Sequence, residues 1–430
     1  MNFAEASHWN LDLERLGSKP GLEAVRELAR RMGDPQRMFR AIHVTGTSGK
    51  GSTSAYAAGI LRAAGLRVGL FTSPHLSVFT ESVQVNGEKI PQTDCARILS
   101  VLRPLCEAME VEDIRHPTQF EVLAVLGFTW FAERRVDCAV VEVGMGGRLD
   151  ATNIMDAQVA VITNVNLEHT KWLGNTVAEI TENKAGIVKS HSTLITAAQD
   201  LETLQVLERV RLSQGARMIR VGQEVKIEPI GESLEGQAFK VNTPKGEYNL
   251  QSVLLGAHQR SNAATAVAAA EALAEGWIPL QVHAVEEGVS ATRWPGRFEV
   301  VQRNPIVVLD GAKDLQAAIA FRLTASSVLP PVKTVAVVGI SSDKDIPGMV
   351  AQFVSVSNHI IACSHRVKTR TADPELIAAE VRRNGVTAEV VPDVKDAVNK
   401  AITLAGRGGI VLVVGSVFLV GEAREIWFPF

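Results

Sequence analysis

The sequence predicts an α/β protein with a large parallel-sheet domain followed by a smaller α/β domain. Three observations support this fold class. Short β-branched runs alternate with helix-length segments, as in a parallel sheet that is covered on both faces. A glycine-rich turn follows the first of these runs and opens a predicted helix. The alternation then restarts for the last stretch of about 130 residues, which is a common domain size.

The chain has 430 residues, of which 46% are apolar and 21% are charged. This composition is typical of a globular protein and excludes disorder, collagen and a small disulfide scaffold. Lys and Arg number 44 against 47 Asp and Glu, so no basic field indicates nucleic acid or membrane. The four cysteines form no CxxC pair, and the longest apolar runs are too short to span a bilayer. The N-terminus lacks the apolar core of a signal peptide, so we expect a cytoplasmic protein.

The elements of the first domain follow from these runs. The expected strands are residues 42–44, 67–71, 136–143 and 157–165, with helices between them that include 53–64 and 119–134. Residues 224–255 carry Gly, Asn and Pro between short alternating runs, which predicts a β-hairpin or meander. Residues 261–275 are rich in alanine and predict a helix.

A domain boundary is predicted at Arg293–Arg297 (RWPGR), after which the β/α rhythm restarts. The strands expected beyond it are residues 306–309, 334–339, 359–363, 388–391 and 410–414. The predicted domains are therefore residues 1–296, which carry the glycine-rich loop of an ATPase-type domain, and residues 297–430, which form a Rossmann-like domain. Two α/β domains that meet at a linker favour a ligand cleft between them.

The strongest local signal for chemistry is the glycine-rich segment of residues 44–53, between a predicted strand and a predicted helix. Glycines let the backbone approach phosphate oxygens, and a helix N-terminus offers unpaired N–H donors. Lys50 would add a positive charge for the phosphates, and Ser52 or Thr53 a hydroxyl. Gly51 separates these two residues, so the segment departs from the usual P-loop spacing. The alternative is a glycine-rich turn with a solvated lysine, but the strand–turn–helix context favours phosphate binding.

Three more polar residues are candidates for a site at the strand ends. Glu142 lies near the end of one apolar run, and His169 follows the next. Ligands of open α/β sheets gather at the carboxyl ends of strands, where a carboxylate can hold Mg²⁺ beside a nucleotide. The alternatives are that Glu142 caps a helix or forms a salt bridge and that His169 is structural. Lys184 by itself is most simply a lysine on a helix surface.

Together these segments resemble the folylpolyglutamate synthase and dihydrofolate synthase family, within the Mur ligase superfamily. The matching segments are 42–53 (IHVTGTSGKGST), 71–76 (FTSPHL), 140–153 (VVEVGMGGRLDATN), 173–189 (LGNTVAEITENKAGIVK), 255–263 (LGAHQRSNA), 295–299 (PGRFE) and 415–422 (GSVFLVGE). They occur in the family's order over almost the whole chain, which is not expected by chance.

The resemblance implies an ATP-dependent amide ligase that adds L-glutamate to the carboxylate of a pterin or folate. The γ-phosphate of ATP would move to the carboxylate, and the amine of glutamate would attack the resulting acyl phosphate. The implied cofactors are ATP and Mg²⁺, the implied partners are these small-molecule substrates, and the implied state is a monomer. The sequence leaves open dihydropteroate, dihydrofolate, a folate polyglutamate or another folate-like pterin as the acceptor.

The resemblance also implies roles for individual residues. Ser73 and Glu142 would bind a first Mg²⁺, and His169 would help to bind a second one together with Lys184. Lys184 would be carbamylated, because a carbamate is an anionic oxygen ligand where an ammonium would repel a metal. The implied ATP-binding residues are Gly49, Lys50, Gly51, Ser52, Asn262, Arg297 and Asp310. The residues implied to face the pterin are Thr118, Gln119, Phe120, Glu121, Leu149, Asp150 and Ala151.

The chain departs from the family pattern at two places. Ser48 stands where the P-loop of the family usually has Asn. The family segment DGAHNP is here Asp310–Leu315 (DGAKDL), so Lys313 replaces the histidine. We expect Lys313 to face the cleft and to keep a positive charge there, as a catalytic residue beside Lys50. The alternatives are that Lys313 pairs with Asp314 or points to solvent.

Two other function classes fit parts of the sequence. The altered segment after Asp310 also fits a ligase for a different acceptor or amino acid, or a nucleotide-binding relative with weakened ligation. A P-loop kinase would explain the phosphate loop but not Lys184 or the second domain. Formation of ADP only when a pterin carboxylate and an amino acid are both present would separate the ligase from the other two.

Overall fold

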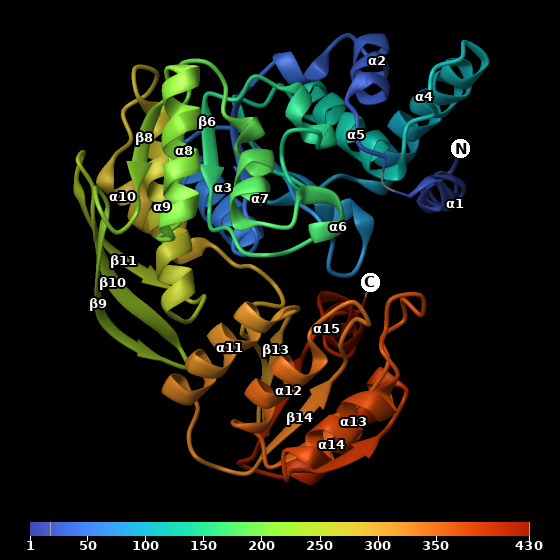
Figure 1. Cartoon of the computed structure of the whole chain (residues 1–430), viewed down its shortest axis with the longest axis vertical. Coiled ribbons are helices and arrows are strands. Elements are labelled where there is room, and N and C mark those ends of the chain that lie inside the picture. The colour runs from blue at the N-terminus through green and yellow to red at the C-terminus, as the bar shows by residue number, and fades with distance from the viewer. Residues whose placement is uncertain (18, 430) are drawn as a thin grey trace.

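The N-terminal region is built on an eight-stranded sheet with the order β4–β3–β2–β5–β1–β6–β7–β8. The computed structural model describes residues 1–17 and 19–429 (Figure 1). The strands from β2 to β8 in this order run parallel, and β3 and β4 form an antiparallel edge. The strands are β1 Arg40–Thr45, β2 Val68–Phe71, β3 Val83–Val85, β4 Glu88–Lys89, β5 Cys138–Glu142, β6 Val159–Ile162, β7 Thr193–Thr196 and β8 Arg217–Arg220.

Helices cover both faces of this sheet, and the central strand β5 shows why its sequence is apolar throughout. Ala139 and Val141 join one buried cluster together with residues of α2, α4 and α5, whereas Cys138 and Val140 join the cluster under α3 and α9. Successive side chains of a strand point to opposite faces, so both sets must be apolar. The helices of this region are α1 Phe3–Asp12, α2 Glu23–Arg31, α3 Lys50–Ala63, α4 Gln92–Val111, α5 Gln119–Glu133, α6 Thr170–Leu173, α7 Val177–Lys184, α8 Leu201–Gln214, α9 Ala257–Ala274 and α10 Val282–Ala291.

A three-stranded antiparallel sheet extends the same region, in the order β11–β10–β9. Its strands are β9 Lys226–Ser233, β10 Gly236–Asn242 and β11 Glu247–Ser252. Burial alternates along β10 and β11, and Phe239, Val241 and Leu250 pack into the cluster under α9. The sequence predicted this meander from its punctuation and its alternating runs, and the structure confirms it.

The C-terminal region has its own six-stranded sheet, in the order β12–β13–β17–β14–β15–β16. Only β12 is antiparallel to its neighbour in this sheet. The strands are β12 Glu299–Arg303, β13 Ile306–Asp310, β14 Thr334–Val338, β15 His359–Ala362, β16 Thr387–Val390 and β17 Ile410–Val414. The helices are α11 Leu315–Val328, α12 Ile346–Val354, α13 Pro374–Arg383, α14 Val394–Ala405 and α15 Val417–Arg424. In Figure 1 this region lies below the N-terminal region, with α15 on the edge that faces it.

The predicted fold class is confirmed, since the chain forms two successive α/β regions, each built on its own mostly parallel sheet. Every strand predicted from an apolar run is present, with bounds that differ by a few residues. The helix expected from residue 53 begins at Lys50, because Gly49 adopts a left-handed conformation that caps it. Strands β3, β4, β7, β8 and β12 were not predicted. In β8, Arg217 and Arg220 interrupt the apolar pattern on which the strand predictions rested. Among the described residues, no helix is long and apolar enough to cross a membrane.

Candidate active site

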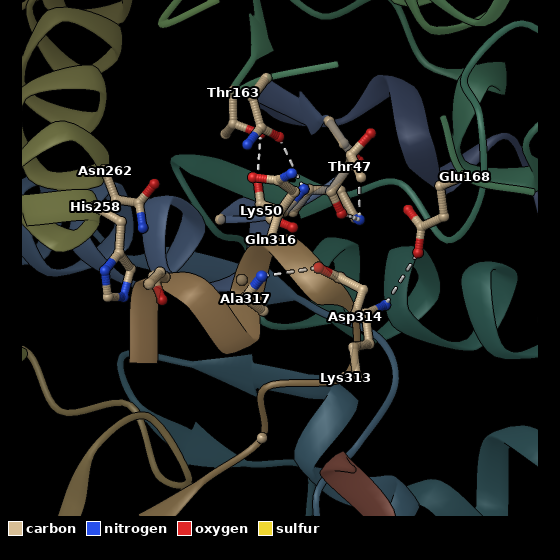
Figure 2. Close-up of a pocket in the computed structure, with 18 of the residues that line it drawn as sticks. Thr47, Lys50, Thr163, Glu168, His258, Asn262, Lys313, Asp314, Gln316 and Ala317 are labelled. Carbon is tan, nitrogen blue, oxygen red and sulfur yellow. Dashed lines mark hydrogen bonds and ion pairs between the residues drawn. The ribbon is translucent and has the colours of Figure 1, made fainter. Parts of the chain in front are cut away.

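A cavity of about 380 Å³ lies where the two regions meet, at the carboxyl ends of their parallel strands. The N-terminal region lines it with the segments that follow β1, β2, β5 and β6, together with the first turn of α9. The C-terminal region lines it with residues 310–317 after β13 and with part of α11. Figure 2 shows Lys50, Glu168, Asn262 and Lys313 around this cavity.

The glycine-rich loop has the geometry of an anion site. Gly49 has a φ of 84°, which favours glycine, and it caps the N-terminus of α3. The Lys50 ammonium folds back and donates to the carbonyl oxygens of Gly46 at 3.0 Å and Thr47 at 3.3 Å. These carbonyls hold the cation in the loop, where it is available to phosphate oxygens.

The extra glycine between Lys50 and Ser52 has a structural reason that the sequence did not reveal. A Cβ atom at Gly51 would lie 3.1 Å from the indole ring of Trp294, which belongs to the linker between the two regions. The tryptophan therefore packs directly on the first turn of α3. Ser52 is buried, and its hydroxyl accepts from the Gln259 amide at 3.3 Å.

Ser73 and Glu142 meet at the ends of the adjacent strands β2 and β5. The Ser73 backbone N–H donates to Oε2 of Glu142 at 3.2 Å. The Glu142 carboxylate is buried, and burial raises its pKa, whereas the charge of Lys50 opposes this shift. The Ser73 hydroxyl is also buried, and it has no hydrogen-bond partner among the described residues. A buried carboxylate and an unpartnered hydroxyl in one cavity are oxygen donors that a hard cation can use.

His169 lies beside Glu168, a residue for which the sequence predicted no role. Nε2 of His169 is 3.6 Å from Oε1 of Glu168, and Nζ of Lys313 is 3.7 Å from the same oxygen (Figure 2). Burial favours the neutral acid, but Lys313 and Lys50 outweigh it and lower the pKa of Glu168. Oε1 has no hydrogen-bond partner among the residues described. Lys313 thus faces the cleft, as expected, and the partner of its ammonium is Glu168 rather than Asp314.

Lys184 ends α7 with its side chain buried at the cavity wall, not on a helix surface. Burial, together with the positive charge of the nearby Lys50, lowers the pKa of its amine to about 7. No hydrogen bond or ion pair of this amine occurs within the described part of the chain. A lysine with this pKa has a substantial neutral fraction near pH 7, and the neutral amine is the form that reacts with CO₂.

The structure brings Asn262, Arg297 and Asp310 to the same cavity from three different elements. Asn262 lies on α9, where its amide donates to Gln259 at 3.1 Å and its side chain contacts the loop at Gly49. Asp310 ends β13 and accepts from the backbone N–H groups of Phe298 and Ala312, each at 2.8 Å. Burial raises the pKa of Asp310 to about 6, against the charge of Arg297.

The seven residues predicted to face the pterin lie behind this cavity rather than on its wall. Thr118 and Glu121 form the capping box of α5, and Glu121 also pairs with Arg115 at 2.6 Å. Asp150 accepts from the N–H groups of Met145 and Thr152, both at 3.0 Å, and burial raises its pKa. These side chains hold their own loops in place. The remaining four are Gln119, Phe120, Leu149 and Ala151, of which Leu149 is exposed.

Phe120 links these residues to the cavity. A Cβ atom at Gly144 would lie 2.6 Å from the Phe120 ring, and Gly144 lines the cavity. The residues predicted to face the acceptor are therefore separated from the cavity at this point by the glycine-rich segment of residues 143–146.

The donors at the cavity fit magnesium that is shared with a nucleotide. Among the described residues, no group of three or more His, Cys, Asp or Glu side chains could hold a metal by itself. Magnesium at nucleotide sites needs only one or two carboxylates, with phosphate and water oxygens completing its shell. Glu142 and the free Ser73 hydroxyl meet that need.

Sequence reasoning missed Glu168, Gln259 and Trp294 at this site. Glu168 precedes His169 directly after β6, so its position at a strand end was a usable signal. Gln259 lies one helical turn before Asn262 on α9, and that spacing places both side chains on one face. No sequence signal showed that Trp294 packs on Gly51.

Comparison with known families defines the class of protein to which this site belongs. The model of the Mur ligase middle domain matches residues 44–270, and that of the Mur ligase glutamate ligase domain matches residues 296–417. The two matches together contain every residue that lines the cavity, whereas Trp294, which packs on Gly51, lies in the linker between them.

Individual relatives narrow the class. The dihydrofolate synthase/folylpolyglutamate synthase of Bacillus subtilis is 32% identical over 98% of this chain and 98% of its own length. A probable bifunctional folylpolyglutamate synthase/dihydropteroate synthase of Halobacterium salinarum is 36% identical over 99% of this chain, and the chain spans about half of that relative (52%). An Escherichia coli protein solved with DHPP and ADP has a TM-score of 0.86 and 31% identity, covering 98% of this chain and 97% of its own. The chain belongs to the folylpolyglutamate synthase and dihydrofolate synthase family of Mur ligases.

Proposed function

We propose that this protein is an ATP-dependent ligase that joins L-glutamate to the carboxylate of a pterin or folate. The observation that carries the proposal is the cavity between the two regions, where a phosphate-type loop, a buried carboxylate and a buried lysine converge. Family membership and the DHPP and ADP bound by the Escherichia coli relative support the same substrates.

The reaction proceeds in two steps. An oxygen of the acceptor carboxylate attacks the γ-phosphorus of ATP, the bond to the β-phosphate oxygen breaks, and ADP leaves. The glutamate amine, after losing a proton, attacks the carbonyl carbon of the acyl phosphate. The C–O bond then breaks, and phosphate leaves with the original carboxylate oxygen. Catalysis rests on positioning and on neutralising the charge that develops on the phosphoryl group.

In this proposal the N-terminal region supplies the nucleotide and metal site. Lys50 and the N–H groups of residues 49–52 bind the phosphates, because they present a cation and the start of α3 to one point. Ser73 and Glu142 would hold a first Mg²⁺ and His169 a second one. Magnesium supplies charge neutralisation at the transferring phosphoryl group. Asn262, Arg297 and Asp310 would contact the nucleotide from α9 and from the C-terminal region.

The environment of Lys184 supports its carbamylation. CO₂ adds only to a neutral amine, and burial keeps the pKa of this amine at about 7 instead of 10.5. The product is a carbamate, whose oxygens can orient a cation beside His169. Without CO₂ the same position would place a buried amine among Lys50 and Lys313, which are both cationic.

Lys313 would serve the incoming amino acid in place of the histidine of the family. Its ammonium crosses from the C-terminal region to within 3.7 Å of Glu168, with 37% of the side chain exposed to the cleft. A lysine there attracts a substrate carboxylate or the leaving phosphate as a flexible point charge. The acceptor would lie beyond the segment of residues 143–146, which lines the cavity. In this proposal the two domains are residues 1–296 and 297–430, and the protein acts as a monomer in the cytoplasm.

The direct test is phosphate release by the purified protein over a matrix of acceptors and amino acids. Dihydropteroate, dihydrofolate and a folate polyglutamate are combined with L-glutamate, D-glutamate, L-aspartate or no amino acid, in the presence of Mg²⁺ and ATP. We expect phosphate only when a pterin carboxylate and L-glutamate are both present, together with the mass of the amide product. Phosphate that forms without an acceptor, or binding without turnover in every combination, contradicts the proposal.

A further inference from the structure

The loop that carries Ser73, residues 73–77, packs against helix α15 of the C-terminal region. A Cβ atom at Gly421, within α15, would lie 2.0 Å from the carbonyl oxygen of Leu76, which is far inside van der Waals contact. Gly421 lies within a helix, and glycine is a poorer helix former than alanine. The helix therefore does not explain the glycine, whereas the approach of the Leu76 carbonyl does. Figure 1 shows α15 on the edge of the C-terminal region that faces this loop.

The side chain of Leu76 enters the core of the other region. It packs against the buried cluster that contains Leu419, Val420 and Ala423 of α15. The linker joins the same contact, because a Cβ atom at Gly296 would lie 2.9 Å from Val420 and 3.3 Å from Leu76. The loop, the linker and α15 therefore meet at one point.

Hydrogen bonds fix the loop on both sides of the segment between Leu76 and the cavity. The backbone N–H groups of Leu76 and Ser77 donate to Oε2 of Glu81 at 2.9 Å and 3.0 Å, and Glu81 pairs with Lys89 at 3.1 Å. Ser73 lies three residues before Leu76, with its N–H on Glu142 and its hydroxyl buried without a partner at the cavity. Only Pro74 and His75 separate Ser73 from Leu76, so a displacement of Leu76 that relieves the clash with a Cβ at Gly421 also strains the backbone at Ser73.

We propose that Gly421 is a positioning residue for the magnesium–nucleotide site: by admitting the Leu76 carbonyl, it holds the Ser73 hydroxyl in place only while the C-terminal region is docked. The metal site is then completed from a distance by α15, which itself contributes no ligand. The proposal rests on the proposed function only in taking Ser73 as a magnesium ligand.

The test compares Gly421→Ala and Leu76→Ala with the matched control Gly231→Ala. Gly231 lies in β9 with an ordinary backbone conformation and has open space where a Cβ would lie. The Mg²⁺ concentration for half-maximal binding of a nonhydrolysable ATP analogue is measured by calorimetry. Hydrogen exchange of the backbone amides of residues 75–80 is followed in the same samples. Neither measurement needs an acceptor or an amino acid, so each reports on the contact between Leu76 and Gly421 independently of ligase turnover.

We expect Gly421→Ala to raise the required Mg²⁺ concentration about tenfold, as for other residues that orient metal ligands. The Leu76 and Ser77 amides should exchange faster, and Gly231→Ala should match the wild type in both measurements. Leu76→Ala keeps the backbone contact with Gly421 but removes the side chain that packs on α15, so it should give the same changes to a smaller extent. If Gly421→Ala does not fold, the result for Leu76→Ala tests the proposal. A lower melting temperature with unchanged Mg²⁺ dependence and exchange would overturn the proposal.

Discussion

The two walls of the nucleotide cavity are held in place in different ways. On the N-terminal wall, neighbouring strand ends bond to one another, as when Thr45 donates to the Gly146 carbonyl and Thr163 to the Ser48 carbonyl, each at 2.6 Å. On the C-terminal wall, Asp310 bonds within its own region, and Lys313 reaches across only to Glu168 at 3.7 Å. The N-terminal wall is built by one sheet, whereas the position of the C-terminal wall depends on how the C-terminal region packs against the N-terminal region.

This difference separates the expected effects of substitutions. Changes on the N-terminal wall should abolish phosphate chemistry while leaving the fold intact, because the strands already fix the geometry. Changes on the C-terminal wall should alter how the second substrate is used. The predictions below run from the largest expected effect to the smallest.

Lys50→Ala should lower turnover by ~10²–10³-fold, the usual effect of removing one group that stabilises developing charge. The melting temperature should stay close to that of the wild type, since the ammonium bonds only to carbonyls of its own loop. Lys226→Ala is the matched control, because Lys226 is exposed on β9 and bonds only to the Gly222 carbonyl. Steady-state kinetics that show full activity in Lys50→Ala would refute the phosphate assignment.

Lys184→Ala should remove most of the activity, and an added short-chain acid should restore part of it by replacing the carbamate. Because the pKa of Lys184 is about 7, wild-type activity should depend more strongly on bicarbonate below pH 7 than above it. A carbamate signal from isotope-labelled bicarbonate should be assigned to Lys184 by magnetic resonance. Wild-type turnover in Lys184→Ala without any added acid would contradict this role.

The stability of the unmodified protein should report the same buried amine. Between about 7 and the ordinary value of 10.5, the unfolded chain binds more protons than the folded one, so stability rises with pH over this window. Lys184→Met removes the penalty of burying the charge. In buffer free of CO₂ and Mg²⁺, its gain in unfolding free energy should be largest below pH 7 and should fade towards pH 10.5. A gain that is independent of pH would contradict the lowered pKa.

Lys313→Met and Lys313→His address the C-terminal wall and should have the smallest effect. We expect the Met variant to lose about tenfold in amino-acid-dependent ADP formation, which is the scale of one charge-assisted hydrogen bond. The His variant should keep a good part of the activity, because it restores a group that can carry a proton. If both variants are as active as the wild type, the altered segment at residues 313–315 has no part in substrate use.

The sequence predicted the N-terminal wall better than the C-terminal wall. Gly49, Lys50, Glu142 and His169 each follow an apolar run, and in a parallel sheet this suffices to bring them to one edge. The sequence could not show whether a polar side chain is free to bind a ligand or already hydrogen-bonded within the protein. Asp150 carries a plausible ligand group, but its carboxylate is used by the loop that it belongs to.

Contacts between the two regions were also beyond the sequence. The pairing of Lys313 with Glu168 joins positions far apart in the chain, and no local pattern marks either residue as the partner of the other. The same holds for Gly421. The reason for a glycine at this position is the close approach of the Leu76 carbonyl, which belongs to a loop of the N-terminal sheet. Local patterns fix strand ends, whereas docking depends on the shapes of two finished surfaces.

The central claim, ligation through an acyl phosphate, is tested most directly with an acceptor in which both oxygens of the reacting carboxylate are heavy oxygen. The labelled acceptor is incubated with the protein, ATP, Mg²⁺ and L-glutamate, and the released phosphate is analysed by mass spectrometry. Since the C–O bond breaks only after the carboxylate has accepted the γ-phosphoryl group, each phosphate released should contain one labelled oxygen. Unlabelled phosphate, formed alongside the amide, would show that the carboxylate is never phosphorylated and would contradict the account.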